Sequence, residues 1–161
     1  MPPQLLIDLE RVDLDRIAYD VPGIERYNPH RGAMRQLDGI CRAAEDEEYG
    51  LHAVGFKDCR DEEFWVPGHI PGRPLLPGVL MIEAAAQLAS FMIKLYRDEP
   101  GFLGFLGCDE VKFRGQVKPG QRLYILGHET EYRHRRRFVC RTQAVCEGEL
   151  VFEGTIKGMS F

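Results

Sequence analysis

A chain of 161 residues with 44% hydrophobic and 29% charged content has the size and composition of one globular domain with its own core. Its formal net charge of −4 argues against nucleic-acid binding, because proteins that neutralise phosphates normally carry a basic surplus. The five cysteines are odd in number and form no C-x-x-C pair. The sequence therefore indicates reduced thiols, and neither a disulfide framework nor a metal site is expected.

Acidic side chains interrupt every apolar run at the N-terminus. These side chains exclude a signal peptide or a spanning helix there, so we expect a cytoplasmic protein without a membrane partner. They are Asp8, Glu10, Asp13, Asp15 and Asp20. Apolar residues at helical spacing weakly predict a short amphipathic helix over residues 5–17.

The remaining pattern predicts an α+β architecture. Residues 37–56 read as a hairpin with a charged turn at 45–48, and residues 77–97 read as a long helix that is apolar nearly all round and buried on all sides. Four more strands are expected, at residues 102–113, 122–133, 138–146 and 150–160. Two strands, one buried helix and four strands predict a sheet wrapped around a helix.

Glu83 is the only charged side chain between Pro77 and Ile93 of the predicted helix. Desolvation favours the protonated form of a carboxyl group, so Glu83 is a candidate general acid near neutral pH. The alternative is a structural glutamate that is paired across an interface or faces an open edge.

His69 lies in the sequence Gly68-His69-Ile70-Pro71, where glycine and proline favour a rigid loop. Such a loop can present an imidazole to a substrate. The alternative is an ordinary surface histidine or one that bonds to the backbone.

Taken together, the stretch from Gly68 to Pro74, the stretch from Leu76 to Ala84 and Gln87 resemble the signature of the 3-hydroxyacyl-acyl-carrier-protein dehydratases. The acid follows the histidine by 14 positions and is glutamate, as in the dehydratase-only branch of that family. The resemblance extends from Asn28 to Phe161, through the Pro29-His30-Arg31 stretch, Asp38, Phe113-Arg114, Val117 and Pro119-Gly120. It divides the chain into an N-terminal extension, residues 1–27, and a dehydratase-like domain, residues 28–161.

The resemblance implies a hotdog fold, in which about six antiparallel strands wrap a long central helix. It also implies a homodimer whose two active sites combine the histidine of one subunit with the glutamate of the other. Assembly into a trimer of dimers is left open. The implied substrate is an acyl-carrier-protein thioester, and no cofactor or metal is expected.

Carried over by position, the family roles make His69 the base for the C2 proton and Glu83 the acid for the departing hydroxyl. The N–H groups of Gly78 and Val79 at the helix start are expected to polarise the thioester carbonyl. A wider set of positions is expected to contact substrate: Phe64, Trp65, Ile70, Pro77, Gln87, Phe113 and Arg114.

Two features depart from the family pattern or extend it. Arg35 and Gln36 stand where apolar residues are usual, which puts the lining of the acyl tunnel in doubt. The basic turn contains Arg133, Arg135, Arg136 and Arg137 and is a candidate docking site for an acidic carrier protein, with a solvated hairpin tip as the alternative.

The leading hypothesis is a dehydratase that converts (3R)-3-hydroxyacyl-acyl-carrier-protein thioesters to trans-2-enoyl thioesters, in fatty-acid, related lipid or polyketide synthesis. A hotdog acyl thioesterase and a non-catalytic acyl-binding paralogue are the alternatives. Retention of both His69 and Glu83 favours elimination chemistry.

Overall fold

The computed structural model describes residues 3–161. Along this part of the chain the helices, 3-10 turns (η) and strands follow one another in the order η1 Leu9–Arg11, α1 Val21–Glu25, η2 Gly32–Met34, β1 Gly39–Asp46, β2 Gly50–Asp58, α2 Gly78–Tyr96, β3 Leu103–Phe113, β4 Arg122–Arg133, β5 Arg137–Cys146 and β6 Glu149–Ser160.

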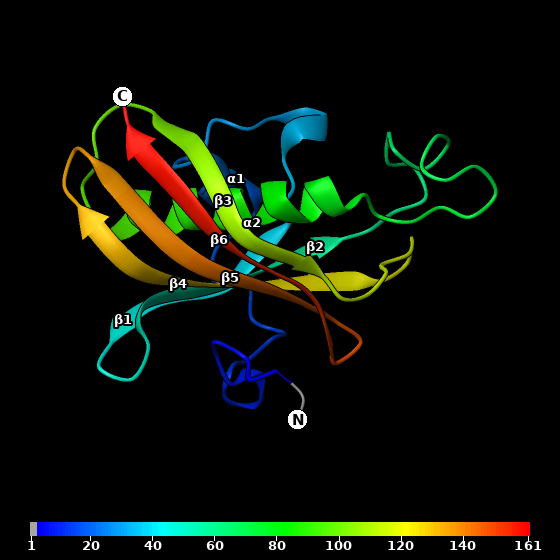
Figure 1. Ribbon diagram of the computed structural model, residues 1–161, viewed down its shortest axis with the longest axis horizontal. Coiled ribbons are helices and arrows are strands. Elements are labelled where there is room, and N and C mark those ends of the chain that lie inside the picture. Colours follow the sequence, from blue (N-terminus) through cyan, green and yellow to red (C-terminus); the bar gives the residue numbers. More distant parts are fainter. Residues whose placement is uncertain (1–2) are drawn as a thin grey trace.

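The six strands form one antiparallel sheet in the order β1-β2-β4-β5-β6-β3. The sheet curves around α2, which crosses its concave face (Figure 1). This arrangement confirms the predicted α+β hotdog architecture and every predicted strand position to within about two residues, the usual scatter of element ends. The β1–β2 turn closes through Asp46, whose carboxylate accepts from the Tyr49 N–H, and through Gly50 at φ +64°.

Helix α2 forms the centre of the main core. It is rich in alanine, leucine and methionine, which favour helix, and its buried face includes Leu88, Phe91 and Met92. Its length and mean hydropathy of 1.5 would suit a membrane span, but the helix is packed inside the sheet instead. The prediction of burial on all sides is wrong for the first turns, because Val79 is 68% exposed and the Glu83 side chain 31% exposed.

The N-terminal segment, here residues 5–14, covers the convex face of the sheet, on the side away from α2 (Figure 1, blue). Its buried Ile7 packs with outward-facing residues of β2, β4 and β5, including Val54, Leu126 and Val145. The Gln143 side chain fastens the segment, because its amide accepts from the Leu6 N–H and donates to the Gln4 carbonyl.

The predicted helix over residues 5–17 is wrong, since only the short turn η1 forms there. Contacts with the sheet and local turns, such as the Asp15 N–H donating to the Asp13 carboxylate, replace helical hydrogen bonds. Helix α1 was not predicted. It begins at an Asp20 N-cap whose carboxylate accepts from the Gly23 N–H, with proline in the first turn.

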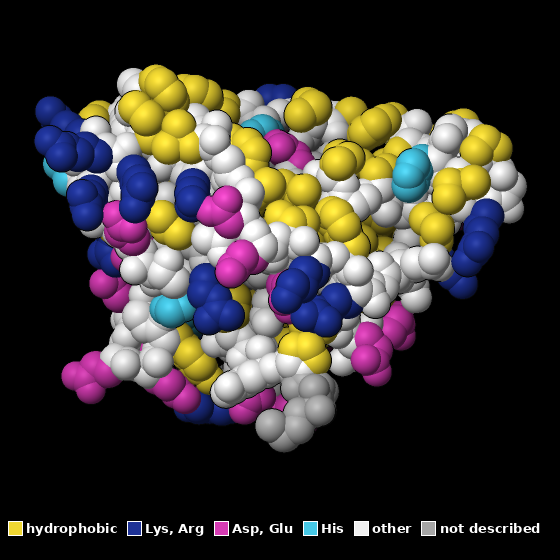
Figure 2. Space-filling view, viewed as in Figure 1, with side chains coloured by type: hydrophobic (Ala, Val, Ile, Leu, Met, Phe, Trp, Pro, Cys, Tyr) yellow, Lys and Arg dark blue, Asp and Glu magenta, His cyan; other side chains and the backbone are white. Residues whose placement is uncertain are grey.

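Strand β3 lies at an edge of the sheet, because it pairs with β6 alone. Its side chains are largely exposed, and Phe105 and Leu106 are 54% and 50% exposed. In the space-filling view, hydrophobic side chains gather over the start of β3 and, farther right, around the loop that precedes α2 (Figure 2). A free strand edge with exposed apolar side chains favours association with another strand.

Candidate active site

The loop before α2 presents His69 to solvent in a fixed orientation. The His69 N–H donates to the Trp65 carbonyl at 2.8 Å, and the Leu75 N–H donates to the His69 carbonyl at 3.0 Å. The ring Nδ1 lies 2.8 Å from the Leu75 carbonyl oxygen. Because a carbonyl oxygen only accepts, Nδ1 carries the proton of the neutral ring. This leaves Nε2 with a lone pair, which suits a general base.

Helix α2 begins directly after this loop. Pro77 is the N-cap and no side chain caps the helix, so the first N–H groups, including those of Gly78 and Val79, are free of a side-chain acceptor. Phe113 lies against this start so closely that a Cβ on Gly78 would be 2.8 Å from its ring. Glycine at this position lets the aromatic ring approach the helix start. The N–H groups there can donate hydrogen bonds to an oxygen on which negative charge develops.

Glu83 is oriented by Gln87, one turn later on α2. The Gln87 Nε2 donates to Glu83 Oε1 at 2.8 Å and to the Met34 carbonyl at 2.7 Å, while its Oε1 accepts from the Gln36 N–H at 2.8 Å. These contacts fix which end of the amide faces Glu83. Since Oε1 of Glu83 already accepts a hydrogen bond, a protonated Glu83 carries its proton on Oε2, the geometry of a general acid.

A cavity of about 150 Å³ opens beside Glu83. Its wall is mostly apolar and comes from β3, β5 and β6 as well as α2, with Leu103, Phe105, Phe138 and Ile156 among the lining residues. A second cavity, of about 390 Å³, shares Ser90, Phe102 and Leu103 with the first. The first cavity offers apolar space that starts at a carboxyl group, whereas charged side chains such as Glu25, Arg26 and Lys94 line the second.

His69 and Glu83 do not meet within one chain. Over residues 3–161, the hydrogen bonds of His69 go to the Trp65 and Leu75 backbone, whereas Glu83 contacts Gln87 and His30. The cavity beside Glu83 is not lined by His69. A single chain therefore holds the two candidate catalytic groups at separate places.

The other predicted substrate contacts are divided between surface and interior. Phe64, Ile70 and Phe113 are 62%, 49% and 51% exposed and are open to a ligand or a partner. Trp65 and Pro77 are buried, and the indole N–H of Trp65 donates to Glu63.

Two polar side chains in the predicted contact set are already engaged. Gln87 is 1% exposed and supports Glu83 from below, so its amide has no free group to offer a substrate. Arg114 forms two hydrogen bonds with the Glu153 carboxylate.

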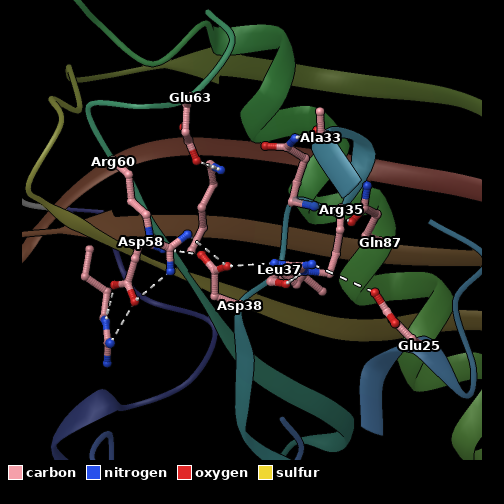
Figure 3. A network of polar contacts seen from close by, with 12 residues as sticks. Glu25, Ala33, Arg35, Leu37, Asp38, Asp58, Arg60, Glu63 and Gln87 are labelled. Carbon is pink, nitrogen blue, oxygen red and sulfur yellow. Dashed lines mark hydrogen bonds and ion pairs between the residues drawn. The ribbon is translucent and has the colours of Figure 1, made fainter. Parts of the chain in front are cut away.

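Arg35 and Gln36 do not close the cavity beside Glu83. The Arg35 guanidinium turns to Asp38 and Glu25, in a chain of ion pairs that continues through Arg60 (Figure 3). The Gln36 side chain is buried and donates to the Ala33 carbonyl. Neither side chain lines the cavity beside Glu83. Of the two residues, only Gln36 contacts Gln87, through its backbone N–H.

The basic turn lies where α2 ends, far along the sheet from the start of that helix (Figure 1). Glu131 pairs with both Arg133 and Arg137, at 3.1 and 2.7 Å. The buried Glu99 carboxylate accepts from the backbone N–H of Arg135 at 2.7 Å and from the Tyr132 hydroxyl. The turn is thus held in shape, and Arg135 and Arg136 are its least engaged guanidinium groups.

Sequence reasoning assigned no chemistry to His30, yet its Nε2 lies 3.5 Å from Glu83 Oε1. No local signal places residues 28–36 against α2. The long-range contact depends on Asn28, whose buried side chain donates to the Gln87 carbonyl.

Comparison with known proteins matches a FabA-like domain to residues 28–155. The chain is 37% identical over 143 residues to the 3-hydroxyacyl-[acyl-carrier-protein] dehydratase FabZ of Caldicellulosiruptor saccharolyticus, a match that covers 83% of this chain and 97% of that protein. The chain belongs to the FabZ dehydratase family. The predicted family is thereby confirmed, together with the hydro-lyase class of enzyme.

Solved structures support the FabZ-type fold at lower sequence identity. The dehydratase heterocomplex ApeI:P of Xenorhabdus doucetiae matches with a TM-score of 0.71 and 17% identity, over 86% of this chain and 90% of that one. A sigma28-regulated virulence protein of Campylobacter jejuni matches with a TM-score of 0.66 and 17% identity, over 89% and 94%. At these identities the likeness concerns the fold alone.

Proposed function

We propose that this FabZ-family chain removes water from (3R)-3-hydroxyacyl-acyl-carrier-protein thioesters in the cytoplasm. The product is the trans-2-enoyl thioester. The observation that carries the proposal is the orientation of two side chains by their hydrogen bonds. His69 has an open Nε2, and Glu83 has its Oε1 occupied by Gln87, which leaves Oε2 to carry a proton. One is arranged to take a proton and the other to give one. The domain at residues 28–161 would carry this chemistry.

In the reaction, Nε2 of His69 takes the C2 proton of the hydroxyacyl group. Negative charge develops on the thioester oxygen, where the N–H groups of Gly78 and Val79 donate hydrogen bonds. Oε2 of Glu83 then gives its proton to the C3 hydroxyl as the C3–O bond breaks, so that water leaves and the C2–C3 double bond forms. The apolar cavity beside Glu83 suits an acyl chain.

We also propose that the working unit is a homodimer with composite sites. Each chain lacks a contact between its own His69 and Glu83, and each exposes the free edge of β3 with Phe105 and Leu106. Two chains joined through this edge would cover the apolar side chains. They would also bring His69 of one chain to Glu83 of the partner subunit.

Hydration of a crotonyl thioester of pantetheine, followed by loss of enoyl absorbance, tests this proposal. General acid–base catalysis supplies about 10²–10⁴-fold in rate, so His69→Ala and Glu83→Gln should each lower kcat by at least about 10²-fold. The exposed residues His134 and Glu62 provide matched controls, because His134→Ala and Glu62→Gln leave the site intact. A wild-type protein inactive on every chain length, with pantetheine and carrier-protein thioesters alike, would overturn the proposal.

A further inference from the structure

His30 lies beside the proposed acid but has no part in the proposed proton transfers. Its Nε2 is 3.5 Å from Oε1 of Glu83, and both side chains line the cavity of about 150 Å³. The two side chains are 26% and 31% exposed, so the pair is partly shielded from water. A partly desolvated imidazole this close to a carboxyl group affects the balance between the ionised and the protonated form of that carboxyl group.

The backbone that carries His30 is held from two directions. The buried Asn28 side chain donates to the Gln87 carbonyl at 2.9 Å. The Arg31 guanidinium donates to the carbonyls of Glu25, Asn28 and His30 at 3.0, 2.8 and 2.9 Å. The imidazole therefore has a fixed position relative to α2.

The surroundings of the ring also assign its tautomer. Among residues 3–161, the buried Nδ1 of His30 has no hydrogen-bond partner. A buried N–H without an acceptor is rarer and more costly than an unused lone pair, so the proton of the neutral ring is on Nε2. Burial lowers the pKa of His30 more than the Glu83 carboxylate raises it, which keeps the ring neutral near pH 7.

We propose that His30 is a positioning residue that stabilises the ionised form of Glu83 by donating a hydrogen bond to it. When Oε2 of Glu83 has given its proton to the departing hydroxyl, the Nε2–H of His30 donates a hydrogen bond to Oε1. It does so beside the N–H already donated by Gln87. The new charge is then shared by two donors in a partly dry site, where such bonds are strong. This inference rests on the proposed role of Glu83 as the acid.

The same geometry predicts a pH effect with a definite sign. The groups facing His30 are Glu83 on α2, Arg31 on its own segment and Lys157 of β6, which lines the same cavity. Below its lowered pKa, His30 takes a second proton on Nδ1 and becomes a cation that pairs with the Glu83 carboxylate, a form that has no proton to give. Protonation of His30 should therefore contribute to the fall of kcat for elimination on the acid side.

Two substitutions at His30 separate a hydrogen bond from simple packing. His30→Leu fills the space without a donor, whereas His30→Gln keeps an amide N–H near the place of Nε2. With a (3R)-3-hydroxybutyryl thioester of pantetheine, assayed in the direction of elimination by the gain of enoyl absorbance, we expect His30→Leu to lower kcat at least about tenfold while KM changes less than about twofold. We expect His30→Gln to recover kcat to within about threefold of wild type and to keep that kcat to a lower pH than wild type does, because the variant lacks the imidazole that becomes protonated.

The matched control is His128→Gln. His128 is on β4, and burial likewise lowers its pKa, but it lies outside the cavity beside Glu83. The kcat of the His128→Gln variant, and its fall at acid pH, should therefore match wild type. Glu83→Gln is assayed alongside. If that variant is inactive while His30→Leu keeps kcat within twofold of wild type, the role of His30 is overturned and the proposed function stands. If Glu83→Gln is active, the proposed function itself fails.

A purely structural role has a different signature. Equal losses of kcat in His30→Gln and His30→Leu, in proportion to equal losses of thermal stability, would overturn the proposal. Should the leucine variant fail to fold, the glutamine variant decides alone. A fall of kcat on the acid side that is unchanged from wild type would then contradict the inference.

Discussion

At the scale of single residues, some titratable side chains are oriented with an atom open to a ligand, and others are buried and unreactive. His69 and Glu83 are each oriented by one hydrogen bond to a fixed neighbour, and each keeps its reacting atom open. The cysteines show the opposite treatment. Burial raises the pKa of Cys59 to about 12 and that of Cys41 to about 11.

We therefore expect Cys59 and Cys41 to resist alkylation by iodoacetamide in the folded protein at pH 8, because the thiolate is the reactive form. Both should react fully once the chain is unfolded in urea, as read by peptide mass spectrometry. The same shifts should make the free energy of unfolding fall as the pH rises above 9.0, the ordinary thiol value, since the unfolded chain then releases protons that the folded chain keeps. Rapid labelling of Cys59 in the native state would contradict this account.

The residue scale also shows where sequence reasoning stops. The motif around His69 and Glu83 could be recognised because its residues are close along the chain. The carboxyl group was expected to be surrounded by apolar residues, but it contacts Gln87 and His30 instead. This difference arises because residues 28–36 return to α2 from about 50 positions away, and no local pattern reports such a contact.

At the scale of elements, strong periodicity was informative and weak periodicity was not. Strand β2 and helix α2 could be predicted because each buries an extensive apolar surface. The segment before α1 also contains many apolar residues, but the convex face of the sheet decides its conformation. Propensity was therefore overridden by packing in the N-terminal segment.

Ile7 tests how much this packing contributes. It is 1% exposed, and removing buried methyl groups from such a site costs about 2–5 kcal/mol, so Ile7→Ala should lower the free energy of unfolding by about 2–3 kcal/mol. Ile17→Ala is the matched control, since Ile17 is 57% exposed and its loss should cost less than about 0.5 kcal/mol. Urea denaturation measures both. Equal effects would mean that the segment does not stabilise the sheet.

The basic turn allows a prediction about carrier-protein docking. Because Glu131 engages Arg133 and Arg137, we propose that Arg135 and Arg136 supply the positive charge that an acidic carrier would meet. Arg135→Glu with Arg136→Glu should raise KM for an acyl-carrier-protein substrate, more strongly at low salt, and leave KM for the pantetheine thioester unchanged. No change with the carrier-protein substrate would favour a solvated hairpin tip.

At the scale of the whole molecule, the free edge of β3 is the feature that a single chain leaves incomplete. We expect the wild-type mass in solution, measured by light scattering, to be that of a dimer or a multiple of it. Leu106→Lys places a charge on this edge and should give a folded monomer with little activity. Ile17→Lys, a change at a similarly exposed residue away from β3, should leave assembly and activity intact. A fully active wild-type monomer would contradict the proposed dimer.

No sequence pattern could predict the composite site from physical reasoning alone, because it belongs to two chains. Mixing two inactive variants tests it most directly. His69→Ala and Glu83→Gln each lose one reacting group, so a mixed dimer retains one site with both His69 and Glu83. After subunit exchange, proved by mass spectrometry of the mixed dimers, we expect about a quarter of wild-type activity, because half of the dimers hold one intact site of two. Persistent inactivity despite proven exchange would contradict it.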